Sequence, residues 1–404
     1  MINGDAGALL VAARLAGPDQ VPALVSAHAA LLGLSKAHVL LVDREQVSLA
    51  YFGHDKQRVP IEGTTPGHVF TTGEVILTGS NGTQTAWLPL LDGIERLGVL
   101  ELHLTPDSAQ PSEHERFAAE VAGLIVTKSL YGDRVEQARR NHEMQLAAEM
   151  QWALLPPRTF GTERVVISGV VEPAYEIGGD TFDYALNGDI LHVALLDAIG
   201  HGLTAATAAS VAVASYRHAR RAKLSLADTA AALDRTIAEQ FGGERFVTGW
   251  LGELDCASGH LAYVNAGHPA AHILRDGKVV KELPAPPVLP FGLDFRLPGD
   301  SRAIAEENLE PGDRLLIFTD GVVEARSDQH GFFGEQRLLD FLEREAASGH
   351  SAPEILRRLT RAVLDFQVGA LQDDSTMLLI EWLADKPREQ RNQLLAAIAE
   401  QTRT

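Results

Sequence analysis

The stretch Gly178-Gly179-Asp180-Thr181-Phe182-Asp183 and its continuation Asp197-Ala198-Ile199-Gly200-His201-Gly202 decide the predicted fold. The residues between these two acidic motifs have the pattern of one β-hairpin. Phe182 to Leu186 is a predicted strand, Asn187-Gly188 a two-residue type I′ turn, and Ile190 to Leu196 the return strand. The sequence therefore predicts that both acidic motifs lie at the same end of one hairpin.

The turn sets the register of this hairpin. If the loop is Asn187-Gly188, Asp180 lies opposite Leu195. Asp180 and Asp197 are then diagonal neighbours on one face, with Cα atoms about 7–8 Å apart. Two carboxylates at that spacing could share metal ions, whereas a one-residue slip would put them on opposite faces.

The bulk composition is that of a globular protein with a core in each domain. A length of 404 residues predicts two or three domains, and 45% hydrophobic residues at a mean hydropathy of -0.02 supply apolar material for each. The net charge of -19 argues against nucleic acid or an anionic membrane as a partner. Cys256 is the single cysteine, which excludes an internal disulfide and a cysteine-cluster metal site. A single cysteine also fits a reducing compartment, so we expect a cytoplasmic location. Because no run of about 18 apolar residues occurs, we expect no membrane span.

Residues 1–110 are predicted to form one α+β domain, because short helices alternate with hairpin-like strands. Its five histidines are scattered along the sequence, and we expect ordinary surface or core side chains rather than haem or metal ligands; they are His28, His38, His54, His68 and His103. The predicted helices are Gln20 to Leu32 and Thr65 to Thr72, and the predicted strands are His38 to Val42, Val47 to Tyr51, Val75 to Leu77, Ala86 to Leu91 and Leu97 to Leu104.

Two motifs of this domain resemble the GAF family. They are Gly67-His68-Val69-Phe70-Thr71-Thr72-Gly73-Glu74-Val75 and the strand pair Trp87-Leu88-Pro89-Leu90 with Leu97-Gly98-Val99-Leu100-Glu101-Leu102. The resemblance implies a sensor domain for a small-molecule or protein signal, although many GAF domains only dimerise or transmit force.

Residues 111–157 are predicted to form a long connecting helix. Ser112 and Glu115 have capping-box spacing at its start, and the prolines of Leu154-Leu155-Pro156-Pro157 end it. The pattern favours a parallel homodimer through residues 112–155 that carries a signal from sensor to effector; the alternative is a helix that packs on its own domains. The apolar seam follows a 4-3 spacing that breaks near His142 and resumes in a shifted frame; it comprises Phe117, Val121, Leu124, Tyr131, Val135, Ala138, Leu146, Met150 and Ala153.

Residues 158–383 carry acidic residues at the ends of predicted strands in four separate places. The acids are Asp180, Asp197, Asp320 and Asp373-Asp374, and glycines stand beside or close to three of these places. The other predicted strands are Val165 to Val171, Phe246 to Leu254, His260 to Val264, His272 to Arg275, Lys278 to Glu282, Arg314 to Thr319 and Met377 to Trp382, and the predicted helices are Leu203 to Arg221, Leu226 to Phe241, Gln336 to Ala347 and Pro353 to Val368.

Carboxylates without histidine or cysteine companions select hard divalent cations, Mg²⁺ or Mn²⁺. Several of them, in a chain without a P-loop, a GxGxxG motif or a Gly-x-Ser-x-Gly elbow, favour a two-metal hydrolase. Two ions about 3.5–4 Å apart would activate a water and offset the charge of a phosphate ester. A single Asp-Gly is an ordinary turn signal, and only the set of acids at strand ends points to metal.

The order of the motifs resembles the metal-dependent protein phosphatase (PPM) superfamily in its bacterial SpoIIE/RsbU branch. Thr181-Phe182 stands where that family often has Trp-Tyr, which changes packing and not ligation. The resemblance implies a β-sandwich of two antiparallel sheets flanked by helices, so the expected fold class of the whole chain is α+β. The matching pieces are Gln151…Leu154-Leu155-Pro156, Gly178-Gly179-Asp180…Asp183, Asp197…Gly200-His201-Gly202, Asn265-Ala266-Gly267-His268-Pro269, Phe318-Thr319-Asp320-Gly321-Val322…Glu324 and Asp373-Asp374…Thr376.

The same resemblance implies a role for each acid. Asp197 would bridge two Mn²⁺ or Mg²⁺ ions with the Ala198 carbonyl nearby. Asp180 would hold the second ion, and Asp320 with one of the Asp373-Asp374 pair would hold the first.

Within that pair, Asp373 is favoured as the direct ligand and Asp374 as a water-mediated one. His201 is a candidate general acid or loop brace, and His268 is expected to be structural.

The implied function is a cytoplasmic bacterial phosphatase that removes phosphate from phosphoserine or phosphothreonine with a two-metal-activated water. The implied substrate is a STAS-type anti-sigma-factor antagonist, so the output would be sigma-factor control. Two alternatives stay open: a catalytically silent pseudophosphatase acting as a binding switch, and another two-metal phosphohydrolase. Because the connecting helix ends shortly before Asp180, a twist in it could move that carboxylate. Residues 384–404 are expected to form a polar helical tail.

Overall fold

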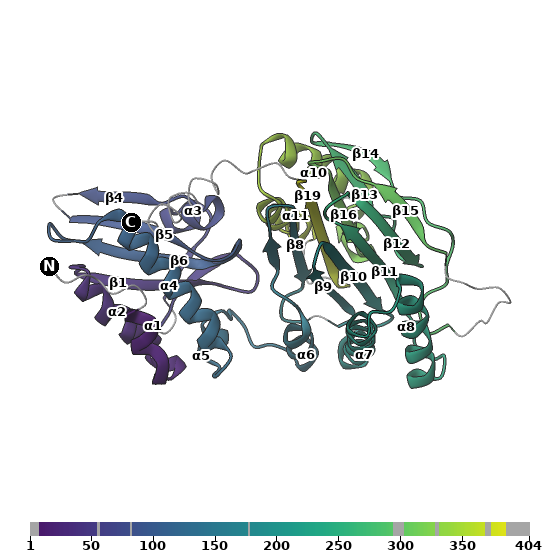
Figure 1. Cartoon of the computed structure of the whole chain (residues 1–404), viewed down its shortest axis with the longest axis horizontal. Coiled ribbons are helices and arrows are strands. Elements are labelled where there is room, and N and C mark those ends of the chain that lie inside the picture. The colour runs from purple at the N-terminus through teal and green to yellow at the C-terminus, as the bar shows by residue number, and fades with distance from the viewer. Residues whose placement is uncertain are drawn as a thin grey trace. The chain divides into compact units, whose positions relative to one another are not determined.

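The computed structural model describes residues 8–54, 57–80, 83–176, 178–293, 303–327, 331–367 and 373–384. The chain divides into two compact units, Met1–Glu143 and Met144–Thr404 (Figure 1). Within the described ranges, no helix is both long and apolar enough to cross a membrane. The predicted tail, after Ala384, lies outside the described residues. The domain boundaries near residues 110, 157 and 383 stay predictions.

The N-terminal unit is an α+β domain, as predicted, built on a six-stranded antiparallel sheet of order β3-β2-β1-β6-β5-β4. Helices pack on both faces, with α3 on one and the others on the opposite face. The predicted strands all form; β3, which was not predicted, is too short to show an alternating pattern. The elements are α1 (Ala8–Ala12), 3-10 turns η1 (Ala13–Leu15) and η2 (Pro18–Gln20), α2 (Val21–Leu31), β1 (Lys36–Val42), β2 (Ser48–Tyr51), β3 (Arg58–Pro60), α3 (Thr65–Thr72), β4 (Ile76–Ser80), β5 (Thr83–Asp92), β6 (Glu95–Leu104), α4 (Pro111–Ser129) and α5 (Arg134–Ala138).

The prediction of one continuous helix over residues 111–157 is wrong. The segment forms α4, α5 and, in the C-terminal unit, α6 (Leu146–Leu154). After α4, Gly132 packs against Pro18, where an added Cβ would lie 3.0 Å from the proline ring. After α5, the Arg58 guanidinium donates 2.8 Å to the Ala138 carbonyl, so a side chain takes the place of further helical hydrogen bonds.

The predicted coiled-coil seam is used inside the N-terminal unit. Phe117, Val121, Leu124 and Val135 are buried in one core with residues of the sheet and of α2. Tyr131, predicted for the same seam, is instead 71% exposed. The capping box is formed by Gln110 and Glu113 rather than by Ser112 and Glu115, and α4 begins at Pro111, the predicted first residue of the helix. The homodimer itself stays a prediction.

The C-terminal unit is a sandwich of two antiparallel sheets, with strand orders β15-β12-β11-β10-β9 and β14-β13-β16-β19-β8-β7. A buried apolar layer joins the two sheets, with Phe182 and Leu195 from one and Ile317 and Leu378 from the other. The strands are β7 (Thr159–Gly161), β8 (Val165–Glu172), β9 (Asp180–Asn187), β10 (Ile190–Ala198), β11 (Val247–Asp255), β12 (His260–Ala266), β13 (His272–Arg275), β14 (Lys278–Glu282), β15 (Ala305–Asn308), β16 (Arg314–Phe318), the separate pair β17 (Arg326–Ser327) and β18 (Gly331–Phe332), and β19 (Ser375–Trp382).

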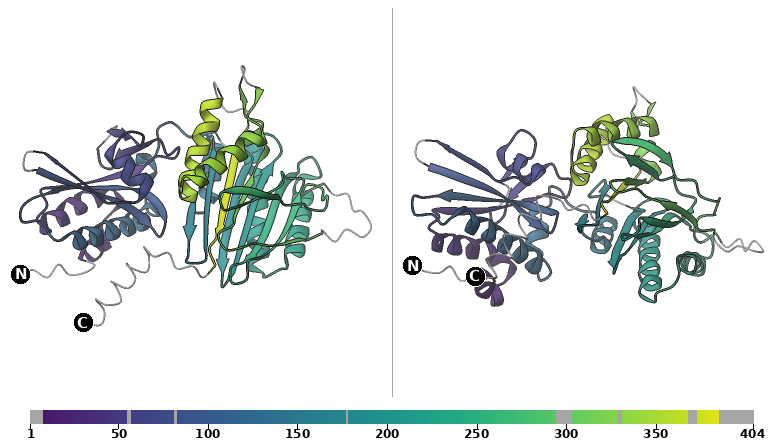
Figure 2. Two further views of the ribbon diagram at one scale, coloured as in Figure 1. Left: turned by 90° about the horizontal axis from the view of Figure 1, so that it is seen from above. Right: turned by 45° about the horizontal axis from the view of Figure 1, so that its top comes forward.

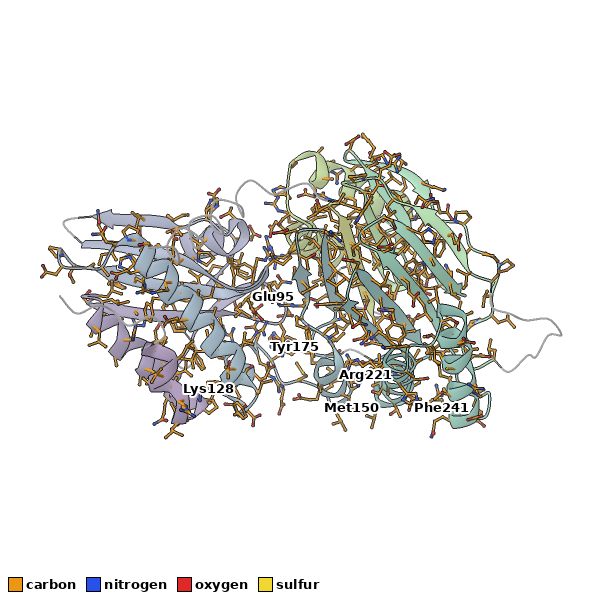
Figure 3. The ribbon with its side chains drawn as sticks, viewed as in Figure 1. Glu95, Lys128, Met150, Tyr175, Arg221 and Phe241 are labelled. Atoms are coloured by element: carbon orange, nitrogen blue, oxygen red, sulfur yellow. The ribbon has the colours of Figure 1, made fainter. Side chains whose placement is uncertain are left out.

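Helices cover the outer faces of this sandwich (Figure 2). Helices α7 (Gly202–Arg221) and α8 (Leu226–Phe241) pack on the five-stranded sheet, where the alanines of α7 allow close approach. Helices α10 (Glu335–Ala347) and α11 (Ala352–Phe366) pack on the other sheet. Figure 3 labels one residue on each of three helices of this unit: Met150 on α6, and the last residues of α7 and α8, Arg221 and Phe241. A short helix, α9 (Asp320–Val323), follows β16.

The register of the central hairpin differs from the prediction by two residues. Asn187 pairs with Ile190, so the loop is Gly188-Asp189, and Asp180 lies directly opposite Asp197 rather than diagonal to it. Gly188 has φ +64°, and glycine at the first loop position is typical of a type II′ turn, not type I′. Because the shift is an even number of residues, the two carboxylates still share a face.

Candidate active site

Two carboxylates from neighbouring strands form the centre of the candidate site. Asp180 begins β9 and Asp197 is the penultimate residue of β10, and the two are paired across the ladder. Asp180 is only 2% exposed and accepts a 2.7 Å hydrogen bond from the Thr319 hydroxyl at the end of β16. Directly opposite residues have Cβ atoms about 4.5–5.5 Å apart. The five-stranded sheet thus supplies a carboxylate pair that the other sheet contacts through Thr319.

The opposite sheet brings the remaining predicted acids to the same place. Asp320 follows Thr319 as the first residue of α9, and Asp373-Asp374 directly precedes β19. Strands β16 and β19 pair so that Phe318 lies opposite Met377, which puts the start of α9 beside the start of β19. All five predicted acids therefore gather where the ends of the two sheets meet.

Asp374 ties the two sheets together at this point. One of its oxygens, Oδ2, accepts hydrogen bonds from the backbone N–H groups of Gly178, Gly179 and Asp180, at 2.7, 2.6 and 3.2 Å. Asp373 in turn accepts a 2.9 Å bond from the backbone N–H of Asp374. Asp374 thus positions the loop that carries Asp180. Its other carboxylate oxygen, Oδ1, takes no part in these three hydrogen bonds.

Glycines permit the close packing of these loops. A Cβ added at Gly179 would lie 2.4 Å from the Ala198 carbonyl oxygen, and one at Gly321 would lie 1.9 Å from the Asp374 carbonyl oxygen. Real Cβ atoms do not approach so closely, so neither position accepts a larger residue without a shift of the backbone. The predicted ligand carbonyl of Ala198 therefore lies against the Gly178-Gly179 turn.

The carboxylates raise one another's pKa. Burial, followed by the charges of Asp197 and Asp374, raises the pKa of Asp180 well above its ordinary value. Burial and the charges of Asp320, Asp373 and Asp374 raise the pKa of Asp197 to about 7. Burial also raises the pKa of the other three acids, with the Asp373 charge adding to it at Asp320. Such mutual destabilisation is the expected result of clustered carboxylates without a cation among them.

The donor set fits hard divalent cations. All the clustered side chains are carboxylates, and a backbone carbonyl lies beside them, which is the ligand chemistry of Mg²⁺ and Mn²⁺. Among the described residues, no three of these carboxylates have oxygens within 4.8 Å of one another. A single ion with bonds of about 2.1 Å could therefore not take three of them as placed. The arrangement instead suits ions that each bind one or two carboxylates and keep several waters.

Two histidines flank the acids in different environments. His201 is exposed between Gly200 and Gly202, and its charge acts on both Asp373 and Asp374 to lower their pKa values. His268 is buried, and burial lowers its pKa to about 3, so its ring is neutral.

The His268 ring lies behind Asp197. Its Nδ1 is 3.2 Å from the Thr248 hydroxyl, which in turn lies 3.5 Å from Asp197 Oδ2. His268 therefore supports Asp197 through Thr248, whereas His201 is exposed.

The structure also shows functions that the sequence did not reveal. Asp183, three residues after Asp180 in the same motif, is 1% exposed and paired with Arg217 and Arg220 of α7, so it anchors that helix. Gln151 of α6 is fully buried and donates 3.3 Å to the Gly178 carbonyl. The helical spacing of Arg217 and Arg220, three residues apart, could have indicated a buried acid; nothing in the sequence indicated the target of Gln151.

Comparison with known proteins identifies the C-terminal unit. The family model for stage II sporulation protein E (SpoIIE) matches residues 187–383, a range that contains Asp197, Asp320, Asp373 and Asp374. The chain is 25% identical over 240 residues to phosphoserine phosphatase RsbU of Bacillus subtilis, a match that covers 59% of this chain and 69% of that protein. It is 26% identical over 189 residues to phosphoserine phosphatase RsbP of the same organism, covering 45% of each.

A solved structure agrees with these matches. The SiaA-PP2C domain of Pseudomonas aeruginosa is similar with a TM-score of 0.50 and 26% identity, covering 58% of this chain and 94% of that domain. The sandwich, the converging acids and these relatives together show that the C-terminal half of this chain is a bacterial serine phosphatase domain of the SpoIIE/RsbU type within the PPM superfamily.

Proposed function

We propose that this chain is a metal-dependent signalling phosphatase of the cytoplasm that hydrolyses phosphoserine or phosphothreonine on a regulatory protein. The observation that carries the proposal is the meeting of five carboxylates from four chain segments, each with a raised pKa. Like charges placed opposite one another on a sheet destabilise it, and bound cations would reverse that effect.

Two divalent cations at these acids would lower the pKa of a water molecule and offset the charge of the substrate phosphate. Asp197, whose pKa responds to Asp320, Asp373 and Asp374 and whose charge acts on Asp180, would hold both ions, with Asp180 and the Ala198 carbonyl at one of them. Asp320 and Asp373 would hold the other, once their side chains have moved closer to Asp197 than they lie in this structure. Asp374 is committed to three backbone amides through one oxygen, which favours an indirect contact with the ion.

Hydrolysis of a phosphoserine also requires a proton for the departing serine oxygen. His201 is exposed, and its charge acts on Asp373 and Asp374, which supports a role for its ring at these acids. We assign it the transfer of that proton, a role for which imidazole is well suited near neutral pH.

The substrate phosphate needs a positive group at the rim of an otherwise acidic site. The Arg245 guanidinium reaches the same loop as His201, since its Nη1 lies 3.3 Å from the position of a Cβ added at Gly200. A guanidinium can bind two phosphate oxygens at once. We therefore assign Arg245 to the binding of the phosphoryl group before hydrolysis.

The likeness to RsbU and RsbP supports a phosphoprotein as substrate, and a STAS-type anti-sigma-factor antagonist is the substrate class we propose. The N-terminal unit would then be the sensor, with a GAF-like fold and a small-molecule or protein signal, and the chain would act as a homodimer.

A comparison of substrates tests the proposed function. Purified full-length protein with Mn²⁺ should release phosphate from phosphoserine and phosphothreonine peptides faster than from ATP. Faster release from ATP would favour the alternative of a nucleotide phosphohydrolase. No release from any of the three under any metal condition would favour a pseudophosphatase.

A further inference from the structure

Two histidines of the N-terminal unit lie together with a buried glutamate on one face of its sheet. His38 on β1 pairs directly with Glu101 on β6, and His103 lies two residues further along β6. Residues two apart on a strand share a face, so the three side chains stand side by side. Their face is the one that α3 covers further along, since Leu40 and Val99 belong to the core beneath α3.

The distances within this group are those of potential metal ligands. One ligand atom from each of His38, Glu101 and His103 lies within 4.8 Å of the others. His103 Nε2 and Glu101 Oε1 are 2.9 Å apart. Ligands of a tetrahedral Zn²⁺ ion, with bonds of about 2.0–2.2 Å, are separated by about 3.4 Å. Side-chain rotations that move these ligand atoms by about 1 Å would therefore complete the site without moving the strands.

Glu101 is the strongest indication that a cation belongs here. The residue is 8% exposed, and its Oε2 makes no hydrogen bond of ordinary geometry. The nearby Tyr51 hydroxyl forms only a weak hydrogen bond to Glu101; burial, the Glu101 charge and this bond together raise the pKa of Tyr51 to about 12. A buried carboxylate oxygen with so weak a partner is costly, and a metal ion would satisfy it.

The histidine rings are also suited to bind a metal ion. Burial lowers the pKa of His38, so its imidazole is neutral and can bind a metal near neutral pH. The His54 ring lies 5.4 Å from the His38 ring, and the His103 ring 6.1 Å from it. A simple hydrogen-bonded pair of His103 and Glu101 would use only two of the three ligand atoms that lie within 4.8 Å of one another.

We propose that His38, Glu101 and His103 form a binding site for one transition-metal ion of the Zn²⁺ class in the N-terminal unit, with the remaining coordination position open to water or His54. Two imidazoles and one carboxylate suit Zn²⁺, Fe²⁺, Co²⁺ or Ni²⁺ and do not suit Mg²⁺. The site differs in ligand chemistry from the carboxylate cluster of the C-terminal unit. It gives the N-terminal unit a defined chemical input, which its fold alone does not identify.

Metal titration of the full-length protein tests this site. Metal-free protein would be titrated with Zn²⁺ against a chromogenic chelator, and with Co²⁺ while its visible absorption is recorded. Each variant would be compared with the parent protein, so that binding at the C-terminal carboxylates cancels. The variants are His38→Ala, Glu101→Gln and His103→Ala, with His68→Ala as the control because His68 is exposed on α3 outside the group.

The parent and His68→Ala should bind one more equivalent of Zn²⁺ than the three ligand variants, or bind it about tenfold or more tightly. Co²⁺ should give the intense visible band of a four- or five-coordinate nitrogen-containing site, lost in the same three variants. Circular dichroism and phosphate release, measured on each variant, report whether it is folded. Equal stoichiometry and affinity in the parent and all folded ligand variants would overturn the proposal, as would Zn²⁺ binding seen only at millimolar concentration.

Discussion

Asp180 and Asp197 lie directly opposite one another on adjacent strands, so the first sheet presents two carboxylates as one pair. Pairs of like charge at this position destabilise a sheet. The second sheet adds three more acids and, through Thr319, a hydrogen bond to the pair. The carboxylates of the two sheets thus repel one another at one place, and bound cations would offset that repulsion.

The first prediction concerns the stability of the metal-free protein as the pH changes. The fold raises the pKa of Asp197 from 3.8 to about 7. Between these values the folded state binds more protons than the unfolded state, so the free energy of unfolding falls as the pH rises from about 4 to about 7. Urea denaturation in EDTA should show this fall, and Asp197→Asn should reduce it.

Saturating Mn²⁺ should raise the free energy of unfolding above pH 7, where the metal-free protein is least stable, because the ions bind only the folded protein. A control variant, Asp189→Asn in the exposed hairpin loop, should follow the parent protein in both conditions. Stability that is independent of both pH and Mn²⁺ would show that the acids are not coupled in the way described.

The second prediction concerns a glycine at the junction of the two sheets. Gly321→Ala puts a Cβ 1.9 Å from the Asp374 carbonyl oxygen, so the loop that carries Asp373 and Asp374 must move. We expect a loss of about 1–3 kcal/mol in the free energy of unfolding, together with weaker Mn²⁺ binding and slower phosphate release.

Gly123→Ala is the matched control for this substitution. Gly123 is exposed within α4, and an added Cβ meets nothing within 4 Å. Helix propensity predicts a gain of up to about 1 kcal/mol with no change in activity. Similar behaviour of the two variants would contradict the role assigned to Gly321.

The third prediction tests the connection between α6 and the site. Gln151→Leu retains the bulk of a fully buried side chain but removes the donor to the Gly178 carbonyl. That carbonyl belongs to the turn whose amides hold Asp374, so the turn should lose order. We expect the Mn²⁺ concentration that gives half-maximal phosphate release to rise by about tenfold, which is the scale of one buried hydrogen bond.

Leu146→Ala on the same helix is the control, because Leu146 is 63% exposed. It should leave the Mn²⁺ dependence unchanged. An unaltered Mn²⁺ dependence in a folded Gln151→Leu protein would contradict the proposal that α6 influences Asp180.

The fourth prediction separates substrate binding from hydrolysis. Arg245→Ala should raise the KM for a phosphoserine peptide by about tenfold with a smaller change in kcat, since the guanidinium is assigned to the bound phosphoryl group. Arg245→Lys should restore part of the loss. A pure loss of kcat, with KM unchanged, would show that Arg245 acts elsewhere in the reaction.

The sequence predicted the elements of both units because their apolar patterns are strong and their turns carry glycine. It predicted that Asp180 and Asp197 lie together, since they flank one hairpin, whereas the convergence of Asp320, Asp373 and Asp374 with them was implied by the family resemblance. The register failed by two residues because Asn187-Gly188 and Gly188-Asp189 are both acceptable turns, and only the pairing of the strands decides between them.

The prediction of one continuous connecting helix failed for a different reason. A 4-3 apolar spacing is the same whether the partner is a second chain or the helix's own domain, and Phe117 and Val121 pack in the domain core. The cluster of His38, Glu101 and His103 was beyond sequence analysis because the pairing of β1 with β6 joins segments far apart in the chain. Nothing in the sequence between them specifies that pairing.

Mn²⁺-dependent phosphate release from a phosphoserine peptide, measured for the parent protein, Asp197→Asn and Asp189→Asn, tests the central claim most directly. The account predicts that the parent and Asp189→Asn are active with Mn²⁺ and inactive with EDTA. Folded Asp197→Asn should lose activity by about 100-fold or more, because its carboxylate interacts with acids on both sheets. Activity that persists in EDTA, or that survives in Asp197→Asn, would contradict the account.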